Sequence, residues 1–309
     1  MSDLKIKDVV IGIDNGYGNT KSENTIIKSG VSVSDREPIV SKDYYKLDNK
    51  YIVFGESGME FTSDKTGSEE HYYLTIASLV KELEHRGFSK VSVILAVGLP
   101  LTWCGSDDKV RFRDYIMRKP VIDLVYKDKS YHIEILETYV FPQGFAAVIG
   151  RYNMTGRNMI VDIGSGTVDS MQINDMRPIE KSTNTEKIGV GSCKEKIRRD
   201  ISTILHTDYE EDIIDDYLIN GCDGSESDLT RIIAENARDY CWTLISKIEN
   251  NGFKVGLTTL YVIGGGARIM RNFSDIGTVP GVNIIDDIHA NAKGYANLAM
   301  QVMKRNKEK

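Results

Sequence analysis

Apolar residues along the chain follow both strand-like and helix-like patterns, which predicts a mixed α/β fold. Short continuous apolar runs are typical of buried strands, and they cover residues 9–13, 91–97, 159–163 and 260–263. Alternating or shorter apolar runs predict further strands at residues 21–28, 51–54, 121–126 and 131–140. Apolar residues at intervals of three and four indicate helices that bury one face. These helices are expected at residues 72–86, 108–119, 145–152, 194–205, 227–250 and 290–304.

A short pattern occurs twice, each time directly after a buried strand. Residues 13–20 read Ile-Asp-Asn-Gly-Tyr-Gly-Asn-Thr, and residues 161–167 read Val-Asp-Ile-Gly-Ser-Gly-Thr. A single Asp-x-Gly-x-Gly is more often an ordinary hairpin turn, because Asp and Gly are common turn residues. Two copies that both follow buried strands instead indicate a duplicated domain, with one loop from each half facing a shared cleft.

Both copies have the composition of a phosphate-binding turn. Glycine permits tight turns in which successive N–H groups converge on one anion. Asp14 and Asp162 would repel phosphate, so we expect them to hold Mg²⁺ through water. We call residues 14–21 the first glycine loop and residues 162–169 the second glycine loop. The residues expected to contact the phosphates are Gly16, Tyr17, Gly18, Asn19, Thr20, Lys21, Gly164, Ser165, Gly166, Thr167 and Asp169.

A third glycine-rich segment follows the strand at residues 260–263. We call it the third glycine loop, and it comprises Gly264, Gly265, Gly266 and Ala267. Bare backbone of this kind lets a flat purine or ribose lie against the chain. It is neither a Walker A loop nor a Rossmann fingerprint, because Gly-Lys-Ser/Thr and Gly-x-Gly-x-x-Gly are both absent there.

Composition narrows the class of protein. A chain of 309 residues suggests about two domains. It has 39 Lys and Arg against 45 Asp and Glu, a net charge of −6, which argues against a protein that coats nucleic acid. Its four cysteines, at positions 104, 193, 222 and 241, form no metal or disulfide pattern. The charged N-terminus and the shortness of the apolar runs predict a cytoplasmic protein without a membrane segment.

Five elements, taken in order, resemble the ATPase superfamily of actin, sugar kinases and heat-shock chaperones. They are the three glycine loops and two connecting segments, residues 141–147 and 291–296. The sequence is most similar to the bacterial ParM-type plasmid-segregation actins. That closer similarity lies in residues 141–143, 188–192 and 262–267. The resemblance implies that the first two loops bind phosphates and that the third binds adenosine.

The resemblance also implies roles for single residues. Gln143 stands where such proteins orient the hydrolytic water, and Asp14 and Asp162 complete the catalytic set. ParM-type proteins often carry Glu at that position, and Gln is a poor general base, so the hydrolysis rate stays open. Gln143 is alternatively the cap of the following helix. Residues expected to reach the ribose and base are Gly191, Ser192, Lys194 and Glu195. Lys194 and Glu195 are equally consistent with an exposed helix face.

The fold implied by the resemblance is actin-like, or ribonuclease-H-like. Two duplicated α/β domains would surround a nucleotide cleft, each with a smaller inserted subdomain. Domain I would cover residues 1–157 with an insert at about 30–90, and domain II residues 158–289 with a helical insert at about 190–255. Residues 290–309 would form a C-terminal helix that returns to domain I.

The function implied is a filament that depends on a nucleotide and Mg²⁺. ATP, or alternatively GTP, would favour head-to-tail assembly, and hydrolysis would destabilise the polymer. A plasmid-encoded DNA-binding adaptor would link filament to plasmid, without direct nucleic-acid binding by this chain. The main alternative is a sugar or acyl kinase, which would need a substrate base, usually an aspartate, beyond the first glycine loop. Residues 98–115 offer no clear candidate, because Asp107, Asp108 and Asp114 fit the start and the exposed face of a helix. Three further classes fit less well. A chaperone-type ATPase would need an appended domain, an iron–sulfur activator a cysteine pattern, and a MreB-like protein an amphipathic N-terminal helix.

Overall fold

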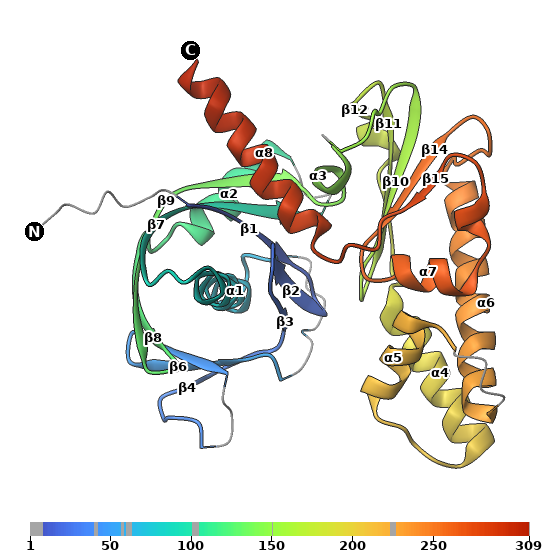
Figure 1. Ribbon diagram of the computed structural model, residues 1–309, viewed down its shortest axis with the longest axis horizontal. Coiled ribbons are helices and arrows are strands. Elements are labelled where there is room, and N and C mark those ends of the chain that lie inside the picture. The colour runs from blue at the N-terminus through green and yellow to red at the C-terminus, as the bar shows by residue number, and fades with distance from the viewer. Residues whose placement is uncertain are drawn as a thin grey trace, which may run out of the picture. The chain divides into compact units, whose positions relative to one another are not determined.

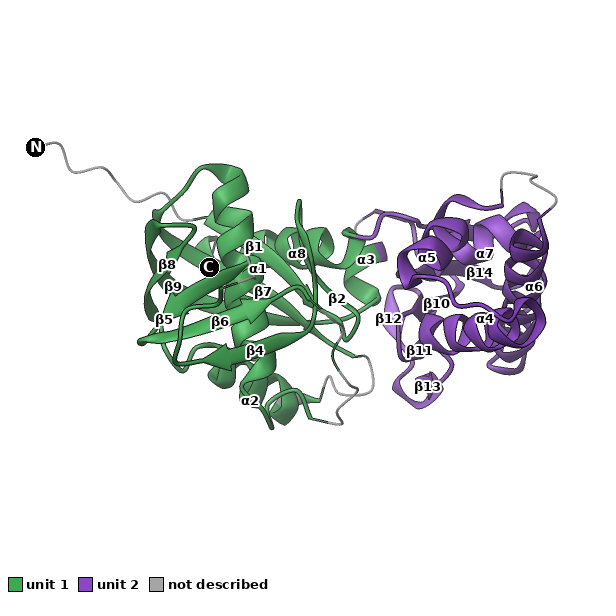
Figure 2. Cartoon of the chain, turned by 90° about the horizontal axis from the view of Figure 1, so that it is seen from below, with its two compact units in different colours: residues 1–147, 289–309 green, residues 148–288 purple. Residues whose placement is uncertain are grey.

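The computed structural model describes residues 9–39, 43–56, 59, 64–100, 105–149, 151–222 and 227–308. The chain divides into two compact units (Figure 2). Unit 1 comprises residues 1–147 and 289–309, and unit 2 comprises residues 148–288. Each unit combines one sheet of parallel and antiparallel strands with helices, so the predicted α/β class is confirmed.

Unit 1 is built on a nine-stranded sheet with the order β3-β2-β1-β7-β9-β8-β5-β6-β4. Its strands are β1 (Val9–Asn15), β2 (Asn19–Ser22), β3 (Ile26–Lys28), β4 (Val31–Ser34), β5 (Tyr44–Leu47), β6 (Lys50–Phe54), β7 (Lys90–Leu99), β8 (Val121–Tyr126) and β9 (Lys129–Pro142). Its helices are α1 (Glu70–Arg86), α2 (Ser106–Ile116) and α8 (Ala290–Lys307), and α3 (Phe145–Val148) ends at the boundary between the units.

Side-chain alternation along β1 lets this strand pack against a helix on each face. Ile11 and Ile13 are fully buried in a core that includes residues of α1, which lies inside the curve of the sheet in Figure 1. Gly12 lies between these two residues, so a side chain here would project from the opposite face of the strand. On that face α8 lies so close that a Cβ atom at position 12 would come 1.9 Å from the carbonyl oxygen of Ala292. Asp14 therefore projects on the α8 side of the sheet, and Asn15 on the α1 side.

The close approach of α8 to β1 makes a stability prediction. We expect Gly12→Ala to lower the free energy of unfolding by about 3 kcal/mol, because the new Cβ atom would clash with backbone atoms of Ala292, which cannot move aside as a side chain could. Thermal unfolding followed by circular dichroism measures the change. Gly67→Ala is the control, since a Cβ atom there makes only ordinary contacts, the nearest at 3.6 Å. Equal melting temperatures for the two variants would contradict the prediction.

Unit 2 repeats the strand arrangement of unit 1 on a smaller scale. Its six-stranded sheet has the order β12-β11-β10-β14-β15, with β13 paired to β11. The strands are β10 (Arg157–Ile163), β11 (Val168–Asn174), β12 (Arg177–Pro178), β13 (Asn184–Glu186), β14 (Thr259–Ile263) and β15 (Val282–Ile284). The helices are α4 (Val190–Leu205), α5 (Glu211–Asn220), α6 (Asp228–Asn250) and α7 (Ala267–Phe273). As with β1, the strand β10 has an antiparallel partner that follows it in sequence and a parallel partner from far along the chain.

The boundary expected at residues 157/158 falls instead at 147/148. The segment before β10 belongs to unit 2 because its carbonyls accept hydrogen bonds from β10 and from the turn between β11 and β12. The Asn158 side-chain amide donates to the carbonyl of Met154 at 3.0 Å, and the Met176 amide donates to the same carbonyl at 3.1 Å. The expected insert at 30–90 joins the main sheet of unit 1, because β5 pairs with β8.

Two predicted elements are shorter than expected. The strand predicted at 21–28 is split into β2 and β3, because the Ser22 amide donates to the carbonyl of Thr25 and closes a tight turn. The helix predicted at 145–152 ends at Val148.

The helix expected at 72–86 is slightly longer than predicted, because it begins at Glu70, and Gly87 ends it with φ of 77°. Cys104 lies outside the described residues.

Candidate functional site

The first glycine loop connects β1 to β2, and its backbone carbonyls are turned into the protein. Four successive carbonyls, from Asn15 to Gly18, accept a hydrogen bond from elsewhere in unit 1. The donors are, in order, Lys65 Nζ at 2.6 Å, Ser29 Oγ at 2.6 Å, the Met59 amide at 2.9 Å and the Ser29 amide at 3.0 Å. When the carbonyls of a tight turn point inward, its N–H groups are left to face an anion. In the described part of the chain the N–H of Gly18 indeed has no acceptor.

The side chains of this loop divide into supporting and outward groups. Thr20 is fully buried, and its hydroxyl lies 2.9 Å from that of Ser29, so it supports the loop. Lys21 is half-buried on β2, directly opposite Asp14 in the strand register. Asp14 is the last residue but one of β1 and is only 4% exposed.

Lys65 supports the first glycine loop and was missed at the sequence level. This lysine is only 3% exposed, and its ammonium also lies 5.6 Å from the centre of the Tyr17 ring. Beside it, His71 packs edge-on against Tyr17, and burial together with the charge of Lys65 lowers the pKa of His71 to about 3. His71 is therefore neutral at pH 7. No sequence signal marks Lys65, because it lies in a polar stretch without periodicity.

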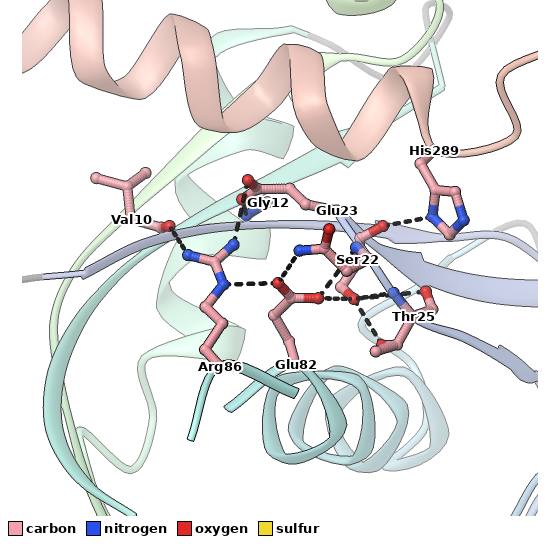
Figure 3. Close-up of polar contacts among 9 residues, drawn as sticks. Val10, Gly12, Ser22, Glu23, Thr25, Glu82, Arg86 and His289 are labelled. Carbon is pink, nitrogen blue, oxygen red and sulfur yellow. Dashed lines mark hydrogen bonds and ion pairs between the residues drawn. The ribbon is translucent and has the colours of Figure 1, made fainter. Parts of the chain in front are cut away.

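A buried charged network holds the β2–β3 turn behind this loop (Figure 3). Glu82 on α1 accepts hydrogen bonds from the Ser22 hydroxyl at 2.5 Å, the Asn24 side-chain amide at 2.6 Å and Arg86 Nε at 2.6 Å. Burial alone would raise the pKa of Glu82, but these hydrogen bonds outweigh burial and lower it below 4.5. Arg86 also pairs with Glu23 at 3.1 Å, which fixes the turn to helix α1.

We expect Glu82→Gln to lower the free energy of unfolding at pH 7 by about 1–3 kcal/mol, because it removes a buried carboxylate that accepts hydrogen bonds from three residues and leaves Arg86 with Glu23 as its remaining charged partner. Since the folded state lowers the pKa of Glu82, its contribution is complete above pH 4.5 and is lost as the pH falls below it. The difference from the wild type should therefore shrink at pH 3.5 in urea unfolding. The control is Glu84→Gln on the same helix, whose exposed pair with Lys127 contributes below about 1 kcal/mol. A pH-independent difference would contradict the assignment.

The second glycine loop connects β10 to β11 and has the same construction as the first. Its carbonyls, from Ile163 to Thr167, all accept backbone hydrogen bonds within unit 2. The donors are, in order, the amides of Gly266 at 3.0 Å, Val190 at 2.9 Å, Gly191 at 2.8 Å, Gly189 at 3.2 Å and Gly164 at 2.9 Å. The amides of Ser165 and Gly166 donate to no acceptor among the residues that the structure describes, and both residues are exposed. This loop therefore also presents N–H groups outward.

The third glycine loop packs against the strand that leads into the second. A Cβ atom at Gly264, where φ is +86°, would lie 2.4 Å from Asp162 Oδ1, and one at Gly266 would lie 2.1 Å from Ile163 Cγ2. These two glycines are therefore required by packing within unit 2. Gly265 is different, because it is exposed and a Cβ atom there meets nothing within 4 Å. Only Gly265 leaves bare backbone for a ligand. Ala267, predicted to belong to the same ligand-binding loop, is fully buried at the start of α7.

The residues predicted near the start of α4 have partners within the protein. The Gly191 amide donates to Ser165 in the second glycine loop, and the Ser192 hydroxyl donates to the carbonyl of Gly189 at 2.8 Å. Lys194 pairs with Asp215 at 2.6 Å and with Glu211 at 2.9 Å. Burial alone would lower the pKa of Lys194, but these two carboxylates outweigh burial and raise it. Glu195 is exposed on α4. A role for Lys194 and Glu195 at the ribose stays a prediction.

Gln143 lies at the end of β9, where the chain turns into α3. Its amide donates to the carbonyl of Leu99 at 2.8 Å, and the Gly144 amide donates to Asn291 Oδ1 on α8 at 2.9 Å. The Gln143 side chain is half-buried and has no hydrogen-bond partner within the described ranges. The alternative role as a helix cap is therefore not seen. In the same unit, the Tyr295 hydroxyl on α8 donates to Asp14 Oδ1 at 3.4 Å.

Two family models match the two halves of the chain. One, described as the N-terminal domain of actin-like proteins, matches residues 12–145. The other, described as the C-terminal part of the archaeal actin homologue, MreB-like, matches residues 160–275. The first match lies within unit 1 and the second within unit 2. The chain belongs to the actin-like superfamily. The resemblance expected from the glycine loops is thereby confirmed, and so is the actin-like fold.

Known proteins of similar sequence or structure are also actin-like. A protein named archaeal actin homolog, from Thermoplasma acidophilum, is 25% identical to this chain. The alignment is 337 residues long with its gaps, and it covers 96% of this chain and 100% of that protein. The structure of Bacillus thuringiensis ParM with AMPPNP has a TM-score of 0.72 at 14% identity and covers 95% of this chain and 98% of that chain. A filament structure of Alp12 has a TM-score of 0.71 at 19% identity and covers 96% and 99%. At these identities the two structures establish the fold alone.

Asp14 in unit 1 and Asp162 in unit 2 each carry the kind of group that binds a hydrated magnesium ion, and that role stays a prediction for both. Asp162, like Asp14, is the last residue but one of its strand, and it is 6% exposed. Carboxylate oxygens are ligands that Mg²⁺ prefers, and the ion usually keeps several waters. Asp169, which was expected to contact the phosphates, accepts hydrogen bonds from the hydroxyls of Thr167 and Thr185 within unit 2. Within the described ranges, every helix is too short or too polar to span a lipid bilayer.

Proposed function

We propose that this actin-like protein binds ATP with Mg²⁺, assembles into filaments and hydrolyses the nucleotide, which weakens the filament. The observation that carries the proposal is the construction of the two glycine loops. In each loop four or more successive carbonyls are bonded inside the protein, and the N–H groups of Gly18, Ser165 and Gly166 have no acceptor among the described residues, which leaves them available to a polyphosphate. GTP is the alternative nucleotide.

The candidate residues divide the work as follows. The N–H groups of both glycine loops bind phosphate oxygens, and Lys21 adds a positive charge. Asp14 and Asp162 would hold Mg²⁺ through water, and the bound ion would neutralise charge on the phosphates. The side-chain amide of Gln143 orients the attacking water by hydrogen bonding, since an amide cannot remove its proton. The bare backbone at Gly265 lies against the nucleoside.

The cellular role we infer is plasmid segregation through a DNA-binding adaptor. The support is similarity to a ParM and to a protein solved as a filament, at identities that establish only the fold. A net charge of −6 favours an indirect link to DNA, because direct binding of phosphate backbones needs a basic surface. Self-association between identical copies in a head-to-tail contact would give an open helical polymer.

The test follows light scattering of the purified chain after addition of Mg-ATP, with pelleting and phosphate release measured in parallel. We expect a rapid ATP-dependent rise in scattering that decays as phosphate appears. Mg-ADP should give a smaller rise, and Asp162→Ala should abolish both signals. Asp123→Ala, an exposed aspartate on β8 that pairs with His132, is the matched control and should behave as the wild type.

A small-molecule kinase is the second candidate, and one observation favours it. A cavity of about 100 Å³ in unit 1 is lined by Asp64, Lys65, Thr66, Leu99, Asp108, Arg111 and Phe112. It brings Asp108, one of the aspartates that a kinase would need as a base, close to Leu99, whose carbonyl binds the Gln143 amide. Turnover of ATP that requires a small acceptor, without any polymer, would favour the kinase and overturn the filament.

A further inference from the structure

The first turns of helix α8 contact two segments of unit 1 that carry proposed catalytic residues. Asn291 and Tyr295 are four residues apart on α8, so they project from the same side of the helix. Asn291 reaches the segment after β9, where Gln143 lies, and Tyr295 reaches the end of β1, where Asp14 lies. One helix face therefore touches both segments.

Asn291 fixes the backbone beside Gln143. Its side-chain oxygen accepts the N–H of Gly144 at 2.9 Å, and the two residues are 147 positions apart in the sequence. Gly144 has φ of +78°, a conformation that glycine adopts without strain, and both groups are buried. The Gln143 amide is held on the other side by the carbonyl of Leu99. The main chain on both sides of the Gln143 side chain is therefore anchored.

Tyr295 stands in the same relation to Asp14. It is fully buried, its ring stacks on Phe141 with centroids 6.4 Å apart, and its hydroxyl donates to Asp14 Oδ1 at 3.4 Å. The ring occupies space that only a glycine at position 98 leaves, since a Cβ atom there would lie 2.0 Å from the hydroxyl oxygen. A buried tyrosine hydroxyl normally finds a polar partner, and here that partner is the carboxylate proposed to hold Mg²⁺.

We propose that Asn291 and Tyr295 are positioning residues for nucleotide hydrolysis, Asn291 acting through Gln143 and Tyr295 acting through Asp14. The inference rests on the proposed function and adds to it how those two groups are held. Its physical basis is that a displacement of about 1 Å at a reacting group can lower the rate by about 100-fold. Neither residue needs to touch the nucleotide.

The first experiment uses Asn291→Ala in the full chain. We expect kcat for ATP hydrolysis to fall by about 10–100-fold, while the Kd for ATP changes by less than about threefold. Asn291→Asp keeps an oxygen acceptor for the Gly144 amide and should restore most of the rate. The matched control is Asn158→Ala in unit 2. Asn158 is equally buried and donates to three backbone carbonyls, so the control should lower the melting temperature and leave kcat unchanged.

A double-mutant cycle distinguishes positioning from general support. If Asn291 acts through Gln143, then Asn291→Ala should change kcat by less than about twofold in a Gln143→Ala background. Equal effects of Asn291→Ala with and without Gln143 would overturn the inference, as would a loss of ATP affinity that matches the loss of rate. A wild-type chain that does not hydrolyse ATP would instead overturn the proposed function itself.

The second experiment uses Tyr295→Phe, which keeps the ring and removes only the hydroxyl. We expect the Mg²⁺ concentration for half-maximal hydrolysis to rise by about 10-fold, because the orientation of the Asp14 carboxylate is lost. Tyr126→Phe is the matched control, since that buried tyrosine also bonds an aspartate, Asp43, at 3.0 Å, away from the glycine loops. An unchanged Mg²⁺ dependence in Tyr295→Phe, or an equal shift in Tyr126→Phe, would contradict the role of Tyr295.

Discussion

Replacing Gln143 by alanine is expected to lower the rate of phosphate release by about 100-fold while the chain still binds ATP. The side chain of Gln143 is half-buried and has no hydrogen-bond partner among the described residues, so it is available to orient a water molecule. Its loss should leave the glycine loops intact, because their carbonyls are bonded by other residues. Filaments of this variant should therefore form with ATP and persist. Single-turnover phosphate release and pelleting over time measure both effects.

Gln143→Glu provides the comparison in the other direction. A carboxylate accepts a proton from water, which an amide does not, so hydrolysis should be faster than in the wild type and filaments should be shorter-lived. Both variants should keep the Kd for ATP within about threefold of the wild type. A Gln143→Ala chain that releases phosphate at the wild-type rate would remove Gln143 from the site and make the departure from Glu at this position irrelevant.

The glycine loops could be predicted from sequence because their signal is local. A buried strand, an aspartate and two glycines occur within ten residues, and the structure places each loop at the end of its strand, at β1 and at β10. The internal repeat predicted the matching hairpins for a similar reason. Two copies of one pattern adopt one geometry, and both are closed by an antiparallel strand that follows in sequence.

The groups that hold the first glycine loop and the segment beside Gln143 could not be predicted, because they come from distant parts of the chain. Lys65 lies 50 residues from the carbonyl that it binds, and Asn291 lies 147 residues from Gly144. Position 65 carries no periodic or compositional signal, and at position 291 the sequence indicates the helix and the connecting segment but not the partner of the side chain. For Lys194 the sequence suggested a ligand contact but did not reveal the partners of this residue within the protein. Its place after a glycine-rich turn suggested a nucleotide contact, but its two acidic partners on α5 are visible only once the helices pack.

Gly264→Ala and Gly265→Ala, neighbours in the third glycine loop, should differ in their effect on stability. Gly264 has φ of +86°, and its Cβ atom would meet Asp162 Oδ1 at 2.4 Å, so we expect a loss of about 2–3 kcal/mol in the free energy of unfolding. Gly265→Ala should change it by less than about 0.5 kcal/mol, because the new methyl group meets nothing within 4 Å. Urea unfolding of the two variants without nucleotide measures this difference.

Their effects on nucleotide binding should also differ, in their dependence on Mg²⁺. Gly264→Ala displaces the carboxylate of Asp162, so the affinity for Mg-ATP should fall by about 10-fold or more, and that loss should largely disappear when ATP is titrated in EDTA. Gly265→Ala fills bare backbone proposed to lie against the nucleoside, so its loss of affinity should be the same with and without Mg²⁺. Unchanged affinity in Gly265→Ala would exclude the third glycine loop from the nucleoside site. A Mg²⁺-independent loss in Gly264→Ala would separate Asp162 from the metal.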